Sequence, residues 1–305
     1  MRIDARHVLV AALVGCGIDA VGAFAGDGTS TVGPDGKPLD GSTGPNDGGD
    51  DGNGEGDGGP SSGDGGPDGS NVPAPVIYVS SLSELWSFSP VTKGWKFLAD
   101  TSANCPGIEE LAVNGKGEIW AIAWTLRALY KIDEQTYACA KIGTPGTTDP
   151  WSFAVTFVPK ETFDAGEDTL VGYASRDYVR IDLNGKGTLI TSNGLDIGTG
   201  PSGDVVSMGN REFVAVSGGT GCISVDCLVE VNPRTGLVVK NWGGFPTGGV
   251  YALGHWGGKI YGFHSSGAVY EATLGGSSFT VTTLPGPDGG LAITGAGSST
   301  LAPTQ

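Results

Sequence analysis

From residue 73 onward, apolar and polar positions alternate in short runs separated by turns rich in Gly, Asn and Pro. Short runs of β-branched and aromatic residues bounded by such turns predict β-strands. One apolar run recurs five times, at residues 111–113, 153–155, 204–206, 251–253 and 291–293. The copies begin 42, 51, 47 and 40 residues apart. A period of roughly 40–50 residues is typical of a repeating unit of four strands.

A second run follows the first in four repeats, at residues 129–133, 178–182, 228–232 and 269–272. Residues 76–79 and 85–88 match the second and third strands of a repeat that has no first strand. We therefore predict an all-β fold, a five-bladed β-propeller in which strands from the two ends of residues 73–305 close one blade. The other blades are predicted at residues 106–147, 148–198, 199–247 and 248–285. The alternative, a β-sandwich, needs only about half as many strands.

The closing strand is predicted at residues 291–294, hydrogen-bonded to residues 76–80. Leu291 and Ile293 are expected to pack inside the closed blade, because a central strand that lost its partner would expose two ladder edges. Residues after Ser298 are expected to be dispensable.

The turns between strands carry the expected chemistry. Residues 114–117 (Asn-Gly-Lys-Gly) and Gly257-Gly258 suit tight hairpins that need positive φ. Residues 233–236 (Pro-Arg-Thr-Gly) form a turn after an apolar strand. This pattern resembles the repeats of YncE-like, NHL-type and quinoprotein-like propellers across residues 73–305. The resemblance implies the fold and leaves the function open.

The N-terminus resembles the signal of bacterial lipoproteins. Arg2 and Arg6 precede an apolar run at residues 8–14, which ends in Leu-Val-Gly-Cys at residues 13–16. The resemblance implies a signal peptide at residues 1–15 and a lipidated Cys16 that anchors the protein to a lipid bilayer of the cell envelope, at the outer membrane or surface of a Gram-negative-type bacterium. The alternative is an ordinary secretory signal with an incidental cysteine. The chain has no run of about 18 apolar residues, so no membrane-spanning helix is predicted.

Residues 16–72 form the predicted linker. Residues 17–72 hold 19 glycines and 11 acidic residues against one Lys. Too few apolar side chains are present to offset the entropy of ordering, so we expect a disordered, self-repelling Gly/Asp-rich tether. The whole chain has 33 acidic and 17 basic residues, a net charge of -16, which argues against a nucleic-acid partner.

The chain has five cysteines, and lipidation of Cys16 accounts for the odd one. Cys222 and Cys227 are expected to close a Gly-rich loop as a disulfide, and Cys105 and Cys139 then pair by elimination. Zinc is the alternative, but the only histidines after residue 73 are His255 and His264, and neither has ligand spacing. We expect no metal and no cofactor.

In a propeller, the loops that enter first strands share a face with those joining second to third strands. That face is expected to carry polar and aromatic side chains around the channel: Glu109, Glu110, Trp124, Arg127, Asp149, Trp151, Arg176, Asp177, Asp204, Tyr251 and His264. Asp204 stands out because apolar residues occupy its position in the sister repeats. We expect it to face channel water, to meet Arg127 or Arg176, or to contact a ligand, since an unpaired buried charge is costly.

A ligand- or protein-binding module best fits these features. The expected ligand contacts are Glu110, Trp124, Trp151, Arg176, Asp204, Tyr251 and His264. The alternatives are a glycosidase- or lactonase-like hydrolase, for which Glu109, Glu110 and Asp204 supply carboxylates, and a structural spacer of the envelope. No motif of a known hydrolase surrounds these residues, so no catalytic residue is assigned and an enzyme is the less favoured class.

Overall fold

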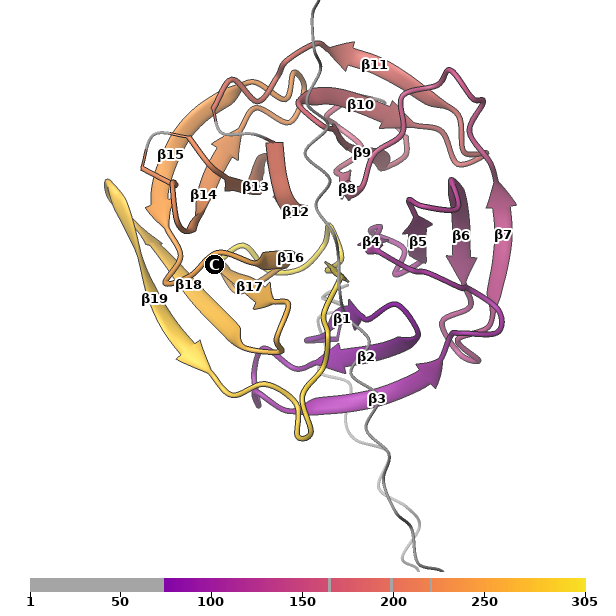
Figure 1. The fold of residues 1–305 in the computed structure, drawn as a ribbon, viewed down its shortest axis with the longest axis horizontal. Helices are drawn as coiled ribbons and strands as arrows, with labels where there is room; N and C mark the ends of the chain where they lie inside the picture. The colour runs from indigo at the N-terminus through magenta and orange to yellow at the C-terminus, as the bar shows by residue number, and fades with distance from the viewer. Residues whose placement is uncertain (1–73, 164–165, 198–199, 220) are drawn as a thin grey trace, which may run out of the picture. The chain divides into compact units, whose positions relative to one another are not determined.

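A computed structural model describes residues 74–163, 166–197, 200–219 and 221–305. These residues contain twenty strands and no helix. The strands form five antiparallel sheets of four strands each, which surround a common axis as a five-bladed β-propeller (Figure 1). The predicted fold class is confirmed. The signal peptide, Cys16 and the tether lie outside the described residues and stay predictions.

Each blade contains four consecutive strands, except the first, which takes its innermost strand from the C-terminal end. The blades, from the innermost strand outward, are as follows: blade I, β20 (Gly295–Gly297), β1 (Ile77–Ser80), β2 (Glu84–Phe88) and β3 (Trp95–Asp100); blade II, β4 (Glu110–Val113), β5 (Ile119–Ala123), β6 (Ala128–Ile132) and β7 (Cys139–Gly143); blade III, β8 (Ala154–Val158), β9 (Thr169–Ala174), β10 (Asp177–Ile181) and β11 (Gly187–Thr191); blade IV, β12 (Gly200–Met208), β13 (Arg211–Ser217), β14 (Asp226–Val231) and β15 (Val238–Gly244); blade V, β16 (Val250–Trp256), β17 (Lys259–His264), β18 (Val269–Gly275) and β19 (Ser278–Leu284).

Burial follows the position of each strand in its blade. Every residue of the inner strands β5 and β8 is buried because both faces of the sheet pack against neighbouring blades. The outermost strands β7 and β19 are largely exposed. Their place at the rim of the ring is visible in Figure 1. The apolar core therefore lies between blades, and each blade depends on both neighbours.

The ring closes as predicted, but with a different segment. Gly295–Gly297, rather than residues 291–294, pairs antiparallel with β1, and Thr294 N donates to Ser80 O at 2.9 Å. Leu291 and Ile293 do pack between blades I and V, as expected. Space explains the shift: a Cβ atom on Gly295 would lie 2.6 Å from the Cα atom of Glu110. Only very small residues fit where the last strand meets β4.

The chain after Ser298, predicted to be dispensable, makes hydrogen bonds to three blades. The C-terminal segment, residues 298–305, crosses the end of the channel at which β4 ends. Ser299 Oγ donates to Asn114 O and Thr300 Oγ1 to Asp168 Oδ2, while Pro303 O accepts from Gly257 N. These partners belong to the hairpins of blades II, III and V, so the segment lies across this end of the ring and joins three blades.

His255 holds the C-terminal segment from inside the protein. Its ring is fully buried, with Nδ1 at 3.0 Å from Ser298 Oγ and Nε2 at 3.4 Å from Ala302 O. Burial lowers its pKa to about 4, so the ring is neutral at physiological pH. The neutral ring both accepts and donates one hydrogen bond, which suits these two partners.

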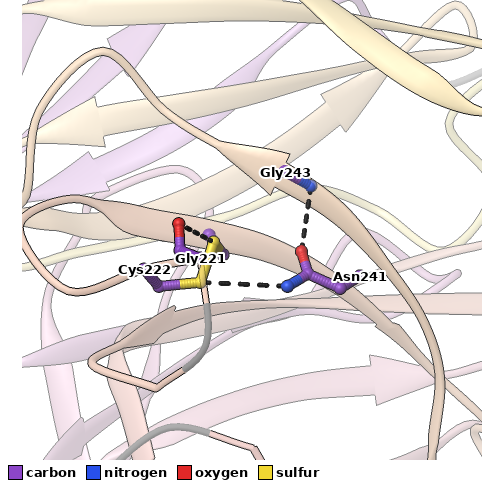
Figure 2. The surroundings of a disulfide bond; sticks show 5 residues. Gly221, Cys222, Asn241 and Gly243 are labelled. Carbon is purple, nitrogen blue, oxygen red and sulfur yellow. Dashed lines mark hydrogen bonds between the residues drawn. A yellow bond between two sulfur atoms is a disulfide. The ribbon is translucent and has the colours of Figure 1, made fainter.

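Both expected disulfides are present. Cys105–Cys139 joins the loop that enters blade II to its outer strand, with Cα atoms 5.7 Å apart. Cys222–Cys227 closes the loop between β13 and β14, with Cα atoms 5.5 Å apart. Figure 2 shows Asn241 beside it: Nδ2 points at Cys222 Sγ, and Oδ1 accepts a hydrogen bond from Gly243 N. The second disulfide thus fixes a long loop against blade IV.

A buried carboxyl group lies between blades III and IV. Tyr178 Oη donates to Glu212 Oε2 at 2.8 Å, while Glu212 Oε1 is buried and has no hydrogen-bond partner among the described residues. Burial raises the pKa of Glu212 from 4.5 to about 8. The folded protein therefore keeps a proton between these pH values that the unfolded chain releases.

Truncation tests the closure. A chain that ends at Pro285 lacks β20 and is expected not to fold, because blade I loses its inner strand. A chain that ends at Gly297 loses the buried hydrogen bonds of the C-terminal segment. We expect about 3 kcal/mol of lost stability and a melting temperature about 10 °C lower, measured by circular dichroism. Deleting residues 17–70 is the control, with no expected change. A Pro285 truncation that melts like the full chain would contradict the closure.

Glu212 tests the interblade core through pH. The stability associated with its proton is present below pH 4.5 and is lost as pH rises through about 8, which amounts to about 5 kcal/mol at roughly 1.4 kcal/mol per pKa unit. Glu212→Gln removes this loss. Urea unfolding at pH 5 and pH 9 should therefore show a much smaller drop for the variant. Glu167→Gln, at an exposed ion pair, should follow the wild type. Parallel profiles for all three proteins would refute the buried proton.

Candidate functional site

The end of the channel opposite the C-terminal segment is open. β4 begins there at Glu110, and the loops that enter β8, β12 and β16 reach the same end. They enclose a cavity of about 420 Å³, which we call the mouth cavity. Its lining residues are Glu109, Glu110, Trp124, Phe153, Ser202, Gly203, Tyr251 and Thr294.

Two irregular strands shape this cavity. The pairing of β12 with β13 shifts between Pro201 and Val205, and the pairing of β16 with β17 shifts between Val250 and Ala252. Such bulges redirect side chains out of the regular alternation, and here they lie at Gly203 and Tyr251. A Cβ atom on Gly203 would lie 2.1 Å from Tyr251 O. Glycine is therefore required where the two inner strands approach one another.

Aromatic side chains form the walls. Trp124, in the loop between β5 and β6, is 48% exposed, and Tyr251 is 42% exposed. The Trp124 ring meets Phe153 edge to face, with centroids 6.3 Å apart. Large aromatic surfaces of this kind are normally buried, so their exposure around one cavity leaves apolar area available to a ligand.

The floor contains two buried carboxyl groups. Asp204 accepts hydrogen bonds from Val205 N at 2.5 Å and Leu253 N at 2.7 Å. Glu110 Oε1 accepts from Leu111 N at 3.0 Å and Ala296 N at 3.1 Å. The two side chains therefore join the innermost strands of four blades: Glu110 joins β4 to β20, and Asp204 joins β12 to β16.

The two carboxyl groups also interact with one another. Burial raises the pKa of Glu110 well above its usual value, and the charge of Asp204 raises it further. Burial likewise raises the pKa of Asp204, although backbone N–H groups oppose the shift. Glu110 Oε2 is buried and has no hydrogen-bond partner of ordinary geometry among the described residues. Because two buried charges in contact cannot both ionise cheaply, ionisation of the second acid of the pair is disfavoured.

This arrangement corrects the expectation for Asp204. It neither faces channel water nor meets Arg127 or Arg176; it is fully buried beneath the cavity. The Arg127 guanidinium donates instead to Gly146 O and Asp149 O, and Arg176 Nε donates to Leu195 O. Asp204 stands where the sister repeats have an apolar residue. Its carboxyl oxygens accept hydrogen bonds from Val205 N and Leu253 N on the inner strands β12 and β16.

Four of the seven expected ligand contacts lie at the mouth, and three do not. Glu110, Trp124 and Tyr251 line the cavity, and Asp204 lies under it. Trp151 is buried in the core between blades II and III. Arg176 is engaged with Leu195, and His264 Nε2 lies 2.9 Å from Gly248 O, so neither contributes to the lining.

Other residues of the expected face have local roles. Glu109 lines the cavity rim, and its carboxylate accepts from Thr125 N and Thr125 Oγ1. Asp149 accepts from Gly146 N within its own loop, and Asp177 accepts from Asn193 N. These two carboxylates serve as turn caps.

Four further residues line the cavity and were not predicted from the sequence: Phe153, Ser202, Gly203 and Thr294. Phe153 was interpreted as part of an inner strand, yet β8 begins one residue later, at Ala154. Gly203 carries no chemistry of its own, so only its close approach to Tyr251 reveals its role. The bulges that place these residues leave no clear periodic signal.

The described residues hold no group of three or more His, Cys, Asp or Glu side chains arranged to bind a metal ion. The acidic residues at the mouth are the buried pair Glu110 and Asp204 and, separately, Glu109 at the rim.

Comparisons with known proteins identify no family. No protein-family model and no curated protein matches the chain. Among solved structures, the chain is similar to one in the crystal structure of a nidogen/laminin complex, with TM-score 0.48 and 13% identity over 74% of this chain and 81% of that chain. It is also similar to a hydrazine synthase chain of Kuenenia stuttgartiensis, with TM-score 0.36 and 17% identity over 71% of this chain and 61% of that chain. At these scores, neither similarity indicates a function.

Substitutions at the floor test its structural role. Asp204→Ala removes the acceptors of Val205 N and Leu253 N, so we expect a loss of about 2–4 kcal/mol in urea unfolding at pH 7. Glu110→Gln keeps one acceptor oxygen and gains a donor toward Asp204, so its stability should stay within about 1 kcal/mol of the wild type. An Asp204→Ala protein as stable as the wild type would show that the strand edges do not need this acid.

Proposed function

We propose that this chain is an extracytoplasmic binding module whose propeller captures a ligand in the mouth cavity. The observation that carries the proposal is the cavity itself: half-exposed Trp124 and Tyr251 stand over a floor that backbone hydrogen bonds hold rigid. A cavity of about 420 Å³ lies within the range of small-molecule sites, roughly 300–1,000 Å³. The C-terminal segment lies across the other end of the ring, on the side opposite to this cavity.

The location rests on separate observations. Two disulfides in one domain are typical of proteins that fold outside the reducing cytoplasm. Within the described residues there is no helix that could span a bilayer. We propose that the lipid-bearing Cys16 anchors the protein in the cell envelope, at the outer membrane or cell surface, and that the acidic tether of residues 16–72 separates the propeller from the lipid.

A hydrolase is less well supported. Glycosidases that use two carboxyl groups keep them about 5–9.5 Å apart, with the sugar or a water molecule between them. Glu110 and Asp204 instead interact directly, and both are buried. Three of their four oxygens already accept backbone hydrogen bonds. These oxygens are better placed to support the cavity than to attack a substrate.

A structural spacer is the other alternative. A spacer needs a stable ring and an anchor, but it gives no reason for exposed aromatic rings to converge on one cavity. The binding module accounts for them because apolar area exposed in a concave site is the usual source of ligand affinity.

A ligand screen tests the proposal. We expect at least one compound in a chemically diverse library to raise the melting temperature of the full chain, with the shift lost in Trp124→Ala. Phe97→Ala is the matched control, because Phe97 has nearly the same exposure, 47%, on the outer strand β3. Compounds whose effect survives Trp124→Ala would contradict binding at the mouth. Turnover of a glycoside or lactone by the wild type, absent in Glu110→Gln, would favour the hydrolase.

Mass spectrometry tests the anchor. Protein extracted from membranes should lack residues 1–15 and carry acyl chains at Cys16, and Cys16→Ser should move it to the soluble fraction. Unmodified protein that begins at Met1 in the membrane fraction would contradict lipidation.

A further inference from the structure

We propose that the mouth cavity takes an alkylated ammonium group, such as a trimethylammonium; this inference rests on the proposed binding function and names the chemistry of its ligand. Three independent features of the cavity lead to it: aromatic rings without a cation, an acidic lining, and acceptors already occupied by N–H groups.

Some aromatic rings of the propeller carry a cation of the protein over their face, and the exposed rings at the mouth do not. Lys residues lie over other rings of the propeller: Lys240 lies 3.1 Å from the Trp242 centroid, and Lys131 lies 5.7 Å from that of Trp120. No such cation lies over Trp124 or Tyr251 in the described part of the chain. The negative faces of these rings attract cations, Trp most strongly. The mouth therefore offers two exposed rings whose faces are not covered by a Lys or Arg of the described residues.

The charge around the cavity has one sign. No Lys or Arg is among its lining residues, whereas Glu109 lies at the rim and Glu110 in the floor, above Asp204. Asp226 is buried next to Ser202 and accepts from Val250 N. The guanidinium groups of Arg127 and Arg176 on the same face, and the ring of His264, are hydrogen-bonded to loop carbonyl groups. An anion is therefore disfavoured in the cavity, and a cation is favoured.

The buried floor supplies a second indication of a cationic ligand. Glu110 lines the cavity and is almost completely buried, and its side chain is in contact with the second acid of the floor, Asp204. Two buried acids in contact repel one another when both are ionised, and a positive charge above them lowers that cost. When Asp204 is ionised, its negative charge also lies beneath the cavity and attracts a cation there.

The occupied acceptors select the kind of cation. Glu110 Oε1 and both oxygens of Asp204 accept backbone N–H groups, and the carboxylate of Glu109 accepts from Thr125. A primary ammonium or a guanidinium brings several N–H donors that would lose water and find few free acceptors. A trimethylammonium has no N–H donor, and its methyl groups can pack against Trp124, Phe153 and Tyr251. The cavity therefore favours the alkylated group.

Binding should also depend on pH. Burial raises the pKa of both Glu110 and Asp204, so the pair holds a proton to higher pH than free carboxyl groups do. A cation above the pair favours the ionised form, so binding releases a proton and becomes stronger as pH rises. A neutral ligand of the same shape lacks this dependence.

Calorimetric titration of the full chain carrying Cys16→Ser, which prevents acylation, tests the inference. The probes are choline and 3,3-dimethylbutan-1-ol, an uncharged molecule of the same shape. We expect choline to bind at least about tenfold more tightly, since cation–π contact in a desolvated site reaches this size, and its affinity to rise between pH 6 and pH 8. Trp124→Ala should reduce choline binding by about tenfold, whereas Phe97→Ala should not change it. Glu110→Gln should weaken choline and leave the alcohol unchanged.

The outcomes separate this inference from the proposed function. Equal affinity for the two probes would overturn the ammonium site but retain a binding cavity. Binding of neither probe would also overturn it, and the library screen would then decide the proposed function by itself. If choline binds, vesicles of phosphatidylcholine compared with vesicles of phosphatidylglycerol reveal the source of the group: selective vesicle binding indicates a lipid headgroup, and binding of free choline alone indicates a small molecule.

Discussion

The innermost strand of every blade has one edge without a neighbouring strand, and the backbone N–H groups on that edge need acceptors. In a solvated sheet water supplies them, but the inner strands of this ring approach one another closely, as at Gly203 and Tyr251. Side chains supply them instead: Glu110 for Ala296 N, Asp204 for Leu253 N, Asp226 for Val250 N and Thr156 for Ser207 N. Each of these bonds joins two different blades. The polar groups at the axis therefore hold the ring together, and the apolar cores between blades could not assemble around unsatisfied edges.

The candidate site follows from the same constraint. The crowded axis admits only Gly and Ala in β20 and requires Gly203 beside Tyr251, so the backbones of the inner strands come close together. The acids that satisfy these strands become the floor of the mouth cavity, and the bulges of β12 and β16 shape its walls. The C-terminal segment occupies the other end of the channel through His255 and the hairpins. The acids that join the inner strands are thus also the floor of the candidate site, and their hydrogen bonds keep this floor rigid. Trp124 and Tyr251 are the exposed groups that remain to contact a ligand.

The sequence predicted the architecture well because repeats and turns are local signals. The five blades, both disulfides and closure by the C-terminal end follow from the recurring apolar runs and the cysteine spacing. The sequence failed where a residue's role depends on distant neighbours. The apolar run at 291–294 resembled a strand more than Gly295–Gly297 did, because only the approach of β4 makes small residues necessary there. Asp204 resembled a channel-facing charge, and Trp151 a ligand platform, because a single sequence does not show which strand edge lacks an acceptor or which ring the next blade covers.

Hydrogen exchange at single backbone amides tests most directly whether the closed axis organises this protein. If side-chain acceptors join the innermost strands, the amides of Ala296 and Leu253 exchange only when the whole propeller unfolds, at the same rate as amides in the middle of β5. The amide of Ala296 is decisive, since β20 has only three residues and the Glu110 carboxyl group is the acceptor of this amide. Exchange of Ala296 as fast as that of an exposed chain end, while β5 stays protected, would contradict the account.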